Sequence, residues 1–144
     1  MDKKIIDELM LRTKAIEQDY NEKIEALQKN IQEQVKPIFE EILKAFPEVK
    51  AFQWTQYTPY FNDGEECVFG VNSDCRVLFD GFEEFMNEYD SEVKKNKAII
   101  ETISSFIDNI PTDAMKGIFG DHVKVTVSLV DGNIKIDTEE YDHD

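Results

Sequence analysis

Apolar side chains recur every eleven positions through the first third of the chain. Three parallel series share this spacing: Ile5, Ile16, Leu27 and Ile38; Leu9, Tyr20, Ile31 and Ile42; and Thr13, Ile24, Val35 and Phe46. Thr13 is their one polar member. Eleven residues over three helical turns give about 3.67 residues per turn, so the series stay on one face of a straight or slightly right-handed helix. The pattern predicts a long amphipathic helix over residues 1–46.

A continuous helix of this length is too long to lie on one small domain. It would extend about 65 Å at 1.5 Å per residue, beside a domain of about 95 residues. Part of the stripe therefore needs another partner, and we expect a coiled-coil dimer or higher oligomer through residues 5–31. Two alternatives stay open: a helical hairpin folded back at Pro37, and a single helix lying along the domain. Because the stripe continues in phase across Pro37, we expect a kink or a restart there, and not a true break.

Strand-like alternation takes over after Phe46-Pro47, and residues 47–144 are predicted to form one domain. The patterns predict a three-strand meander over 52–61, 67–71 and 76–79, helices over 91–110 and 112–119, and a hairpin over 123–136. Turns are expected at Asn62-Asp63-Gly64, Asn72-Ser73-Asp74 and Asp131-Gly132. The expected fold class is α+β, with a long N-terminal helix and an antiparallel sheet of about five strands.

Charge changes the list of plausible partners. The 144 residues carry a formal charge of -15, and 51–144 hold twenty acids against seven bases. Direct binding of nucleic acid through a basic patch is therefore not expected. The chain has no apolar stretch of about 18 residues and no signal-peptide pattern, so we expect a cytoplasmic protein without membrane contact. Cys67 and Cys75 lack metal or redox spacing and are expected to be free thiols, and no cofactor is indicated.

The segment 52–64 is the best candidate for a contact surface. Its rings could stack on a planar ligand while its amides read the ligand's edge, as in concave sites with apolar walls and a few polar groups. The candidate residues are Trp54, Gln56, Tyr57, Tyr60, Asn62 and Asp63, with Gln53 beside them. Alternatively, Phe52 and Trp54 belong to the core and the tyrosines to its rim. A phosphate ligand would need cations from elsewhere, such as Arg76, Lys124 or Lys135.

An acidic ribbon over residues 80–92 gives a second hypothesis. Its surface acids include Glu83, Glu84, Glu88 and Asp90, and its interleaved aromatic residues are expected to anchor it. Such a domain could occupy the basic groove of a nucleic-acid enzyme, with carboxylates standing where phosphates would be. The simpler alternative is an acidic surface without a partner.

Catalytic signatures are thin. The sequence contains no GxSxG, P-loop, GxGxxG or HExxH motif. His122 and His143 are its only histidines, and His143 lies between Asp142 and Asp144, which could ligate a divalent cation. A small metal-dependent hydrolase is therefore a third hypothesis, but a terminal tail more often binds no metal, and we expect no metal site.

Three separated blocks carry a resemblance to known sequences. WTQYTPYFNDGEECVFGVN, FGDHVKVTVSLVDG and the terminal EEYDHD resemble a group of small uncharacterised proteins encoded by bacteriophages. The resemblance implies a phage protein acting in the bacterial host, by blocking an enzyme or sequestering a nucleotide. The leading hypothesis is a non-catalytic, self-associating binding protein whose partner is a host protein or a small planar ligand.

Overall fold

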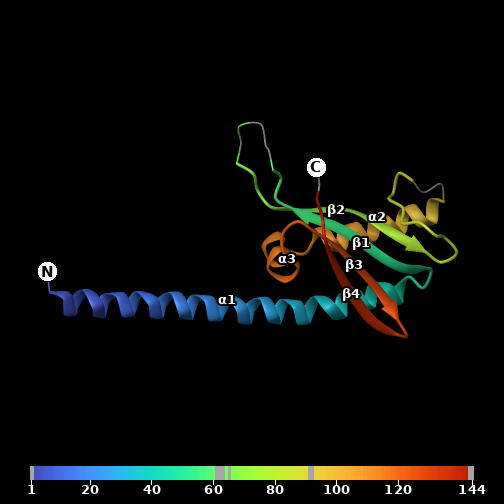
Figure 1. The fold of residues 1–144 in the computed structure, drawn as a ribbon. Helices are drawn as coiled ribbons and strands as arrows, with labels where there is room; N and C mark the ends of the chain where they lie inside the picture. The colour runs from blue at the N-terminus through green and yellow to red at the C-terminus, as the bar shows by residue number, and fades with distance from the viewer. Residues whose placement is uncertain (1, 61–63, 65, 91–92, 143–144) are drawn as a thin grey trace.

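The computed structural model describes residues 2–60, 64, 66–90 and 93–142 (Figure 1). Its elements are α1 (Lys3–Ala45), β1 (Val49–Tyr57), β2 (Gly70–Phe79), α2 (Lys94–Asp108), α3 (Thr112–Phe119), β3 (Val123–Val130) and β4 (Asn133–Glu140). The four strands form an antiparallel sheet in the order β2-β1-β3-β4. An isolated β-bridge between Met86 and Val77 adds one more paired residue at the β2 edge. The expected α+β class, long N-terminal helix and C-terminal hairpin are confirmed.

Helix α1 starts at a side-chain cap and continues through its proline. Asp2 Oδ1 accepts a hydrogen bond of 3.0 Å from the Lys4 backbone N–H, which satisfies one of the free donors of the first turn. Pro37 lies inside the helix on an exposed turn, between the buried side chains of Val35 and Phe39. Their packing on the domain offsets the loss of about 3 kcal/mol that an interior proline causes. A hairpin folded back at Pro37 is therefore excluded.

The two halves of α1 have different surroundings. Val35, Phe39, Ile42 and Leu43 are buried in the same core as the sheet. Residues 3–23 are exposed, and Figure 1 shows this part of the helix projecting beyond the domain. The alternative of a helix lying along the domain thus holds only for its C-terminal half. None of the helices in the described part of the chain is long and apolar enough to cross a membrane.

Strand β2 corrects the expected meander. Residues 70–71 of the strand predicted at 67–71 and the whole strand predicted at 76–79 belong to one strand, which pairs with β1 on both sides of residues 73–75. The expected turn at 72–74 is a bulge, because Gln53 pairs with Arg76 while Thr55 pairs with Asn72. Asn72 Oδ1 accepts a hydrogen bond from the Asp74 backbone N–H at 3.2 Å, so the turn-forming residues are accommodated without ending the strand.

The final hairpin follows its sequence signal. Asp131 and Gly132 have positive φ angles of 52° and 79°, the conformation that a two-residue type I′ turn requires. Pairing then runs from Val130 and Asn133 to Val123 and Glu140 without a register shift. The predicted turn at 62–64 is different, because Asn62 and Asp63 lie outside the described residues.

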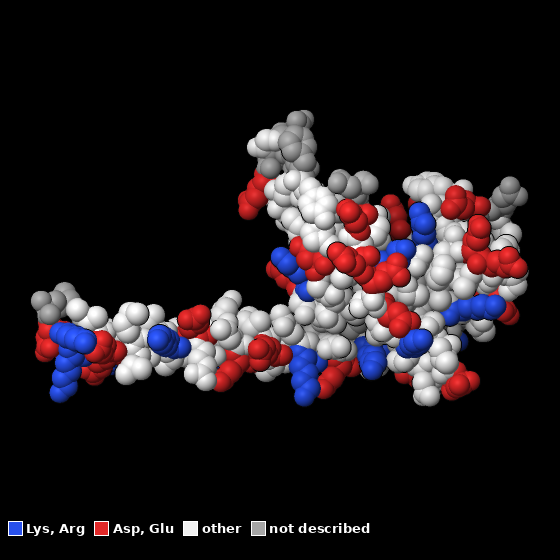
Figure 2. All heavy atoms as spheres, viewed as in Figure 1, with Lys and Arg blue, Asp and Glu red and all other residues white. Residues whose placement is uncertain are grey.

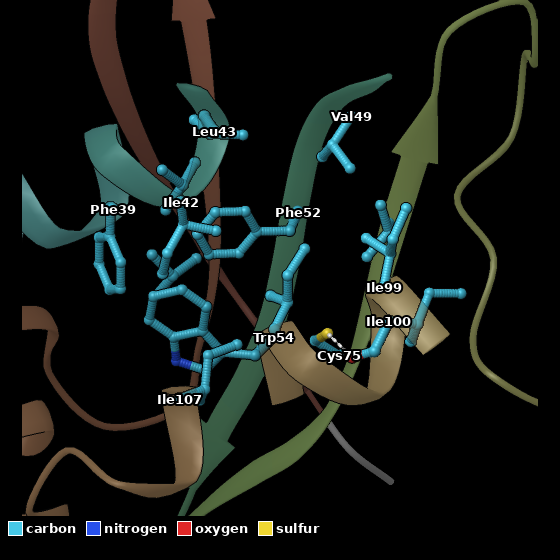
Figure 3. Close-up of a cluster of buried hydrophobic side chains, with 14 of the residues drawn as sticks. Phe39, Ile42, Leu43, Val49, Phe52, Trp54, Cys75, Ile99, Ile100 and Ile107 are labelled. Carbon is cyan, nitrogen blue, oxygen red and sulfur yellow. Dashed lines mark hydrogen bonds between the residues drawn. The ribbon is translucent and has the colours of Figure 1, made fainter. Parts of the chain in front are cut away.

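All three helices cover the same face of the sheet. Phe39 of α1 lies 5.5 Å, between ring centroids, from both Phe52 and Trp54 of β1, and Figure 3 shows these side chains pointing toward one another. From α2, Ile100 accepts a weak hydrogen bond from Cys75 Sγ at 3.7 Å. From α3, Phe119 meets the Trp54 ring edge-on at 5.5 Å. The other face of the sheet carries no helix from the described part of the chain.

Candidate functional site on the open sheet face

Strand β1 divides the aromatic segment between two faces. Phe52 and Gln56 are fully buried and Trp54 is 2% exposed, all on the helix-covered face. Gln53 and Thr55, together with Tyr57, are half-buried on the opposite face. Successive side chains of a strand alternate between the two faces of the sheet. Once the helices cover one face, one set of side chains is therefore buried and the other set stays partly exposed. Trp54 and Gln56 therefore do not belong to a contact surface, which corrects the expectation for these two residues.

The Gln56 amide is fully used inside the protein. Its Oε1 accepts a hydrogen bond of 3.0 Å from Trp54 Nε1. Its Nε2 donates to the carbonyl oxygens of Met115 at 2.9 Å and Gly120 at 2.7 Å, at the C-terminal end of α3. Gln56 therefore ties β1 to α3 and to the glycine that follows it. Its role is structural, and it has no donor left with which to read a ligand.

The chain leaves β1 through a hydrogen-bonded corner. Asp121 Oδ1 accepts from the Thr58 backbone N–H at 2.8 Å and from the His122 backbone N–H at 2.9 Å, and Asp121 Oδ2 accepts from the Thr58 hydroxyl at 2.6 Å. Desolvation by itself would raise the pKa of Asp121. The hydrogen bonds to Thr58 and His122, with the nearby His122 charge, outweigh it and lower this pKa below its usual value of 3.8.

The two tyrosines of the candidate segment contact rings at the two ends of the β3–β4 hairpin. Tyr57 lies 5.7 Å from Tyr141, and Tyr60 stacks on the His122 ring at 5.0 Å, both between ring centroids. Tyr60 is 60% exposed. These contacts place Tyr57 and Tyr60 at the rim of the sheet. Asn62 and Asp63 are outside the described residues, so the predicted group reduces to these two tyrosines.

A small polar cavity lies beside Tyr141 on the open face. Its volume is about 140 Å³, and its lining includes Gln53, Thr55, Asn72, Arg76, Lys124 and Tyr141. Arg76 of β2 is the strand partner of Gln53 in β1, and Lys124 of β3 is the strand partner of Thr55 in β1. The register of three strands thus brings two cations to opposite sides of β1.

The charge around this cavity differs from that of the domain as a whole. Arg76 forms no ion pair within 4.0 Å with any described residue, and the Lys124 ammonium lies 3.6 Å from the exposed Glu139 carboxylate. Among the described residues that line the cavity, Asp74 is the one acid. Two of the seven bases in 51–144 therefore gather at one cavity of an acidic domain. Lys135 is not part of it and lies 3.7 Å from Asp137.

The acidic ribbon is held at its middle. Met86 and Val77 exchange two backbone hydrogen bonds of 2.9 Å, and Asn87 Oδ1 accepts from the backbone N–H groups of Tyr89 and Asp90, each at 2.9 Å. Glu83, Glu84 and Asp90 are exposed, and Glu88 is half-buried. Tyr89 is 78% exposed, so it does not anchor the ribbon, contrary to the expectation for its aromatic residues. Figure 2 shows acidic side chains spread over the visible face of the domain with basic ones among them, and both signs along α1.

The metal-dependent hydrolase hypothesis needs several ligands close together. No cluster of three or more His, Cys, Asp or Glu side chains suited to a metal ion occurs among them. His143, on which the metal hypothesis depended, is outside them. Cys67 and Cys75 are free thiols, as expected, and burial raises the pKa of Cys75 to about 11, which keeps this thiol protonated and unreactive. Comparisons with protein-family models, curated proteins and solved structures give no match to this chain.

The structure adds residues that the sequence did not single out as a group. Arg76 and Lys124 stand out as rare bases, but Thr55, Asn72 and Tyr141 carry no local signal. Their proximity depends on the register across β2, β1 and β3 and on the bulge in β2. Only the alternation of β1 indicated which of its side chains would share a face.

Proposed function

We propose that this protein is a non-catalytic binding protein whose contact surface is the open face of the sheet. The observation that carries the proposal is the placement of Arg76 and Lys124 at one cavity of an otherwise acidic domain. A cation without a carboxylate partner is available to an incoming anion, and the planar guanidinium of Arg76 suits two oxygens of one group. The ligand class is a small molecule that carries a carboxylate or phosphate group.

The surroundings of the two cations fit this ligand class. Gln53, Thr55 and Asn72 supply amide and hydroxyl groups at the cavity, and Tyr141, which also lines it, contacts the Tyr57 ring. A cavity of about 140 Å³ accommodates one acidic group, while the remainder of a planar ligand would lie against the tyrosine rings. The resemblance to phage-encoded proteins supports a setting in the cytoplasm of a bacterial host, where the protein would sequester its ligand.

Charge reversal at the cavity tests the proposal. Native mass spectrometry of the purified protein, with titration of inorganic phosphate, citrate and a nucleoside monophosphate, would measure binding. We expect Arg76→Glu and Lys124→Glu to weaken binding of the best probe at least tenfold. Lys135→Glu is the matched control, because it reverses a base of the same sheet outside the cavity, and it should leave binding unchanged. Equal loss in all three variants, or no binding by the wild-type chain, would contradict the proposal.

The acidic ribbon supports a second candidate function. Its exposed Glu83, Glu84 and Asp90 are presented on a backbone held by the Met86–Val77 bridge and the Asn87 turn, so their positions are defined. A defined array of carboxylates fits the basic groove of a nucleic-acid enzyme. Replacement of the three acids by their amides should then abolish capture of such an enzyme while small-ligand binding at the cavity persists. Undiminished capture would rule out this function.

A further inference from the structure

The N-terminal half of α1 carries an apolar face that no described part of the chain covers. Ile5, Leu9, Ile16 and Tyr20 are between 50% and 72% exposed. Farther along the same stripe, Ile24 and Ile31 are half-buried and Val35 is buried against the domain, whereas Leu27 and Ile38 stay exposed. Most helical stability in proteins comes from packing of an amphipathic face, so we expect this exposed face to have a partner.

We propose that the partner is a second copy of this chain, and that the projecting halves of the two α1 helices pack antiparallel. In the alignment that we infer, Ile5 lies against Ile24 of the second copy, Leu9 against Tyr20, and Thr13 against Ile16. Two-fold symmetry repeats each contact. Every layer then joins two members of the eleven-residue stripe, and Thr13 is the only polar side chain in the interface core. This inference does not depend on the ligand proposed above.

Charge selects this alignment. One flank of the stripe, formed by residues just before stripe residues, carries Glu8, Arg12, Asp19 and Lys23, and the opposite flank carries Glu17. In an antiparallel pair such flanking residues face their counterparts on the other helix. The alignment places Glu8 beside Lys23 of the second copy, and Arg12 beside Asp19. A slip of one helical turn, about four residues, in either direction would set Arg12 against Lys23 or Glu8 against Asp19, which are like charges.

A parallel pair does not use these charges. In a parallel pair the flank that carries Arg12 would face the other flank of the second copy, where Ile6 and Met10 lie. Only Arg12 would then meet an acid, Glu17. A parallel partner would also continue past Ile24 toward Gln28 and Ile31, where α1 meets the domain. In the antiparallel pair the partner helix ends near Ala26, just before Gln28, whose side chain packs against Gly117 of α3. The overlap between the two helices thus covers the part of α1 that projects from the domain.

Cysteine cross-linking of the full-length chain tests the orientation. In a Cys67→Ser background, Leu9→Cys and Tyr20→Cys chains are prepared separately and then mixed under mild oxidation. We expect a disulfide-linked heterodimer in the mixture and little covalent dimer from either chain alone. A covalent dimer from Leu9→Cys alone would show parallel packing and overturn the proposal, as would the absence of any cross-link.

Sedimentation equilibrium tests the register and the partner. We expect the wild-type chain to have the mass of two copies. Ile16→Glu should raise the dimer dissociation constant at least 100-fold, and Arg12→Glu roughly tenfold, since attraction to Asp19 becomes repulsion. Adding Asp19→Arg to Arg12→Glu should restore dimerisation, and the control Lys14→Glu, on the far side of the helix, should have no effect. Circular dichroism would confirm that each variant folds. A monomeric wild-type chain, or no rescue by the second charge change, would overturn the proposal.

Discussion

The two faces of β1 carry similar mixtures of aromatic and amide side chains but have different fates. On one face, Phe52, Trp54 and Gln56 are at most 2% exposed and lie beneath the helices. On the other, Gln53, Thr55 and Tyr57 are half-buried and no described helix packs on them. The comparison shows that residue type alone did not separate core from surface in this strand.

The polar groups on the two faces also do different work. Gln56 makes three hydrogen bonds within the protein, so its burial leaves no amide hydrogen without an acceptor. Gln53 accepts one bond of 3.3 Å, from the Thr126 hydroxyl, and borders the cavity. A fully satisfied amide stabilises the fold, whereas a partly used amide on an open face can exchange water for a ligand. Four substitutions test the roles assigned to the buried face, to the open face and to the corner at Asp121.

Trp54→Ala should have the largest effect on stability. It removes a ring that contacts Phe39, Phe52 and Phe119, and it leaves a cavity in the core. We expect a loss of about 3–5 kcal/mol in the free energy of unfolding, measured by urea denaturation. Thr55→Ala, the next residue but on the open face, should change stability by less than about 0.5 kcal/mol. Similar losses in both variants would invalidate the comparison of the faces.

Gln56→Leu should have the second largest effect. The side chain keeps its approximate volume, but Trp54 Nε1 and the carbonyls of Met115 and Gly120 lose their partner in a buried site. We expect a loss of about 2–3 kcal/mol in the free energy of unfolding. The matched change Gln53→Leu on the open face should alter stability little and weaken ligand binding instead. A stable Gln56→Leu variant would show that the tie to α3 is dispensable.

Asp121→Asn should have a smaller effect that depends on pH. The folded-state pKa of Asp121 lies below its unfolded value, so the carboxylate contributes stability above about pH 4. That contribution is lost as the pH falls through the folded pKa. We expect the variant to be less stable by about 1 kcal/mol at neutral pH, with the difference from wild type shrinking in strong acid. Thermal unfolding at pH 7 and pH 2.5 would measure it, and a difference that grew in acid would refute the assignment.

Thr126→Val should have the smallest effect. It removes a single hydrogen bond of 3.3 Å to Gln53 on the open face, where water can replace it. We expect a change below about 0.5 kcal/mol in the free energy of unfolding, by the same urea measurement. A larger loss would indicate that the open face contributes to the core more than its exposure suggests.

Local patterns predicted the elements well where one signal dominated. The eleven-residue repeat predicted a helix to residue 46, and α1 ends at Ala45. Asp131-Gly132 predicted a hairpin turn, and both residues take the required positive φ. Asn72-Ser73-Asp74 was equally turn-like, yet pairing with β1 continues on both sides of it, because a bulge accommodates those residues. Tertiary pairing overrode the local preference there.

The candidate site was predictable only in part. Alternation along β1 indicated which of its residues share a face, but not which face the helices would cover. The sequence named Arg76 and Lys124 as possible cations, yet they are 48 positions apart and meet only through the register of three strands. Tyr141 joins them because its backbone N–H donates to the His122 carbonyl at 2.8 Å, next to the start of β3, and its ring contacts Tyr57 at the end of β1.

The sequence by itself determined the periodic elements of this protein: the long helix, the alternation of β1 and the final turn. These depend on interactions between residues a few positions apart, which leave a periodic trace. Only the tertiary structure decided that the helices bury Trp54 and Gln56, that half of α1 leaves the domain, and that Arg76 and Lys124 face one cavity. Those outcomes depend on long-range packing and register, in which the partner of a side chain is set by the whole fold.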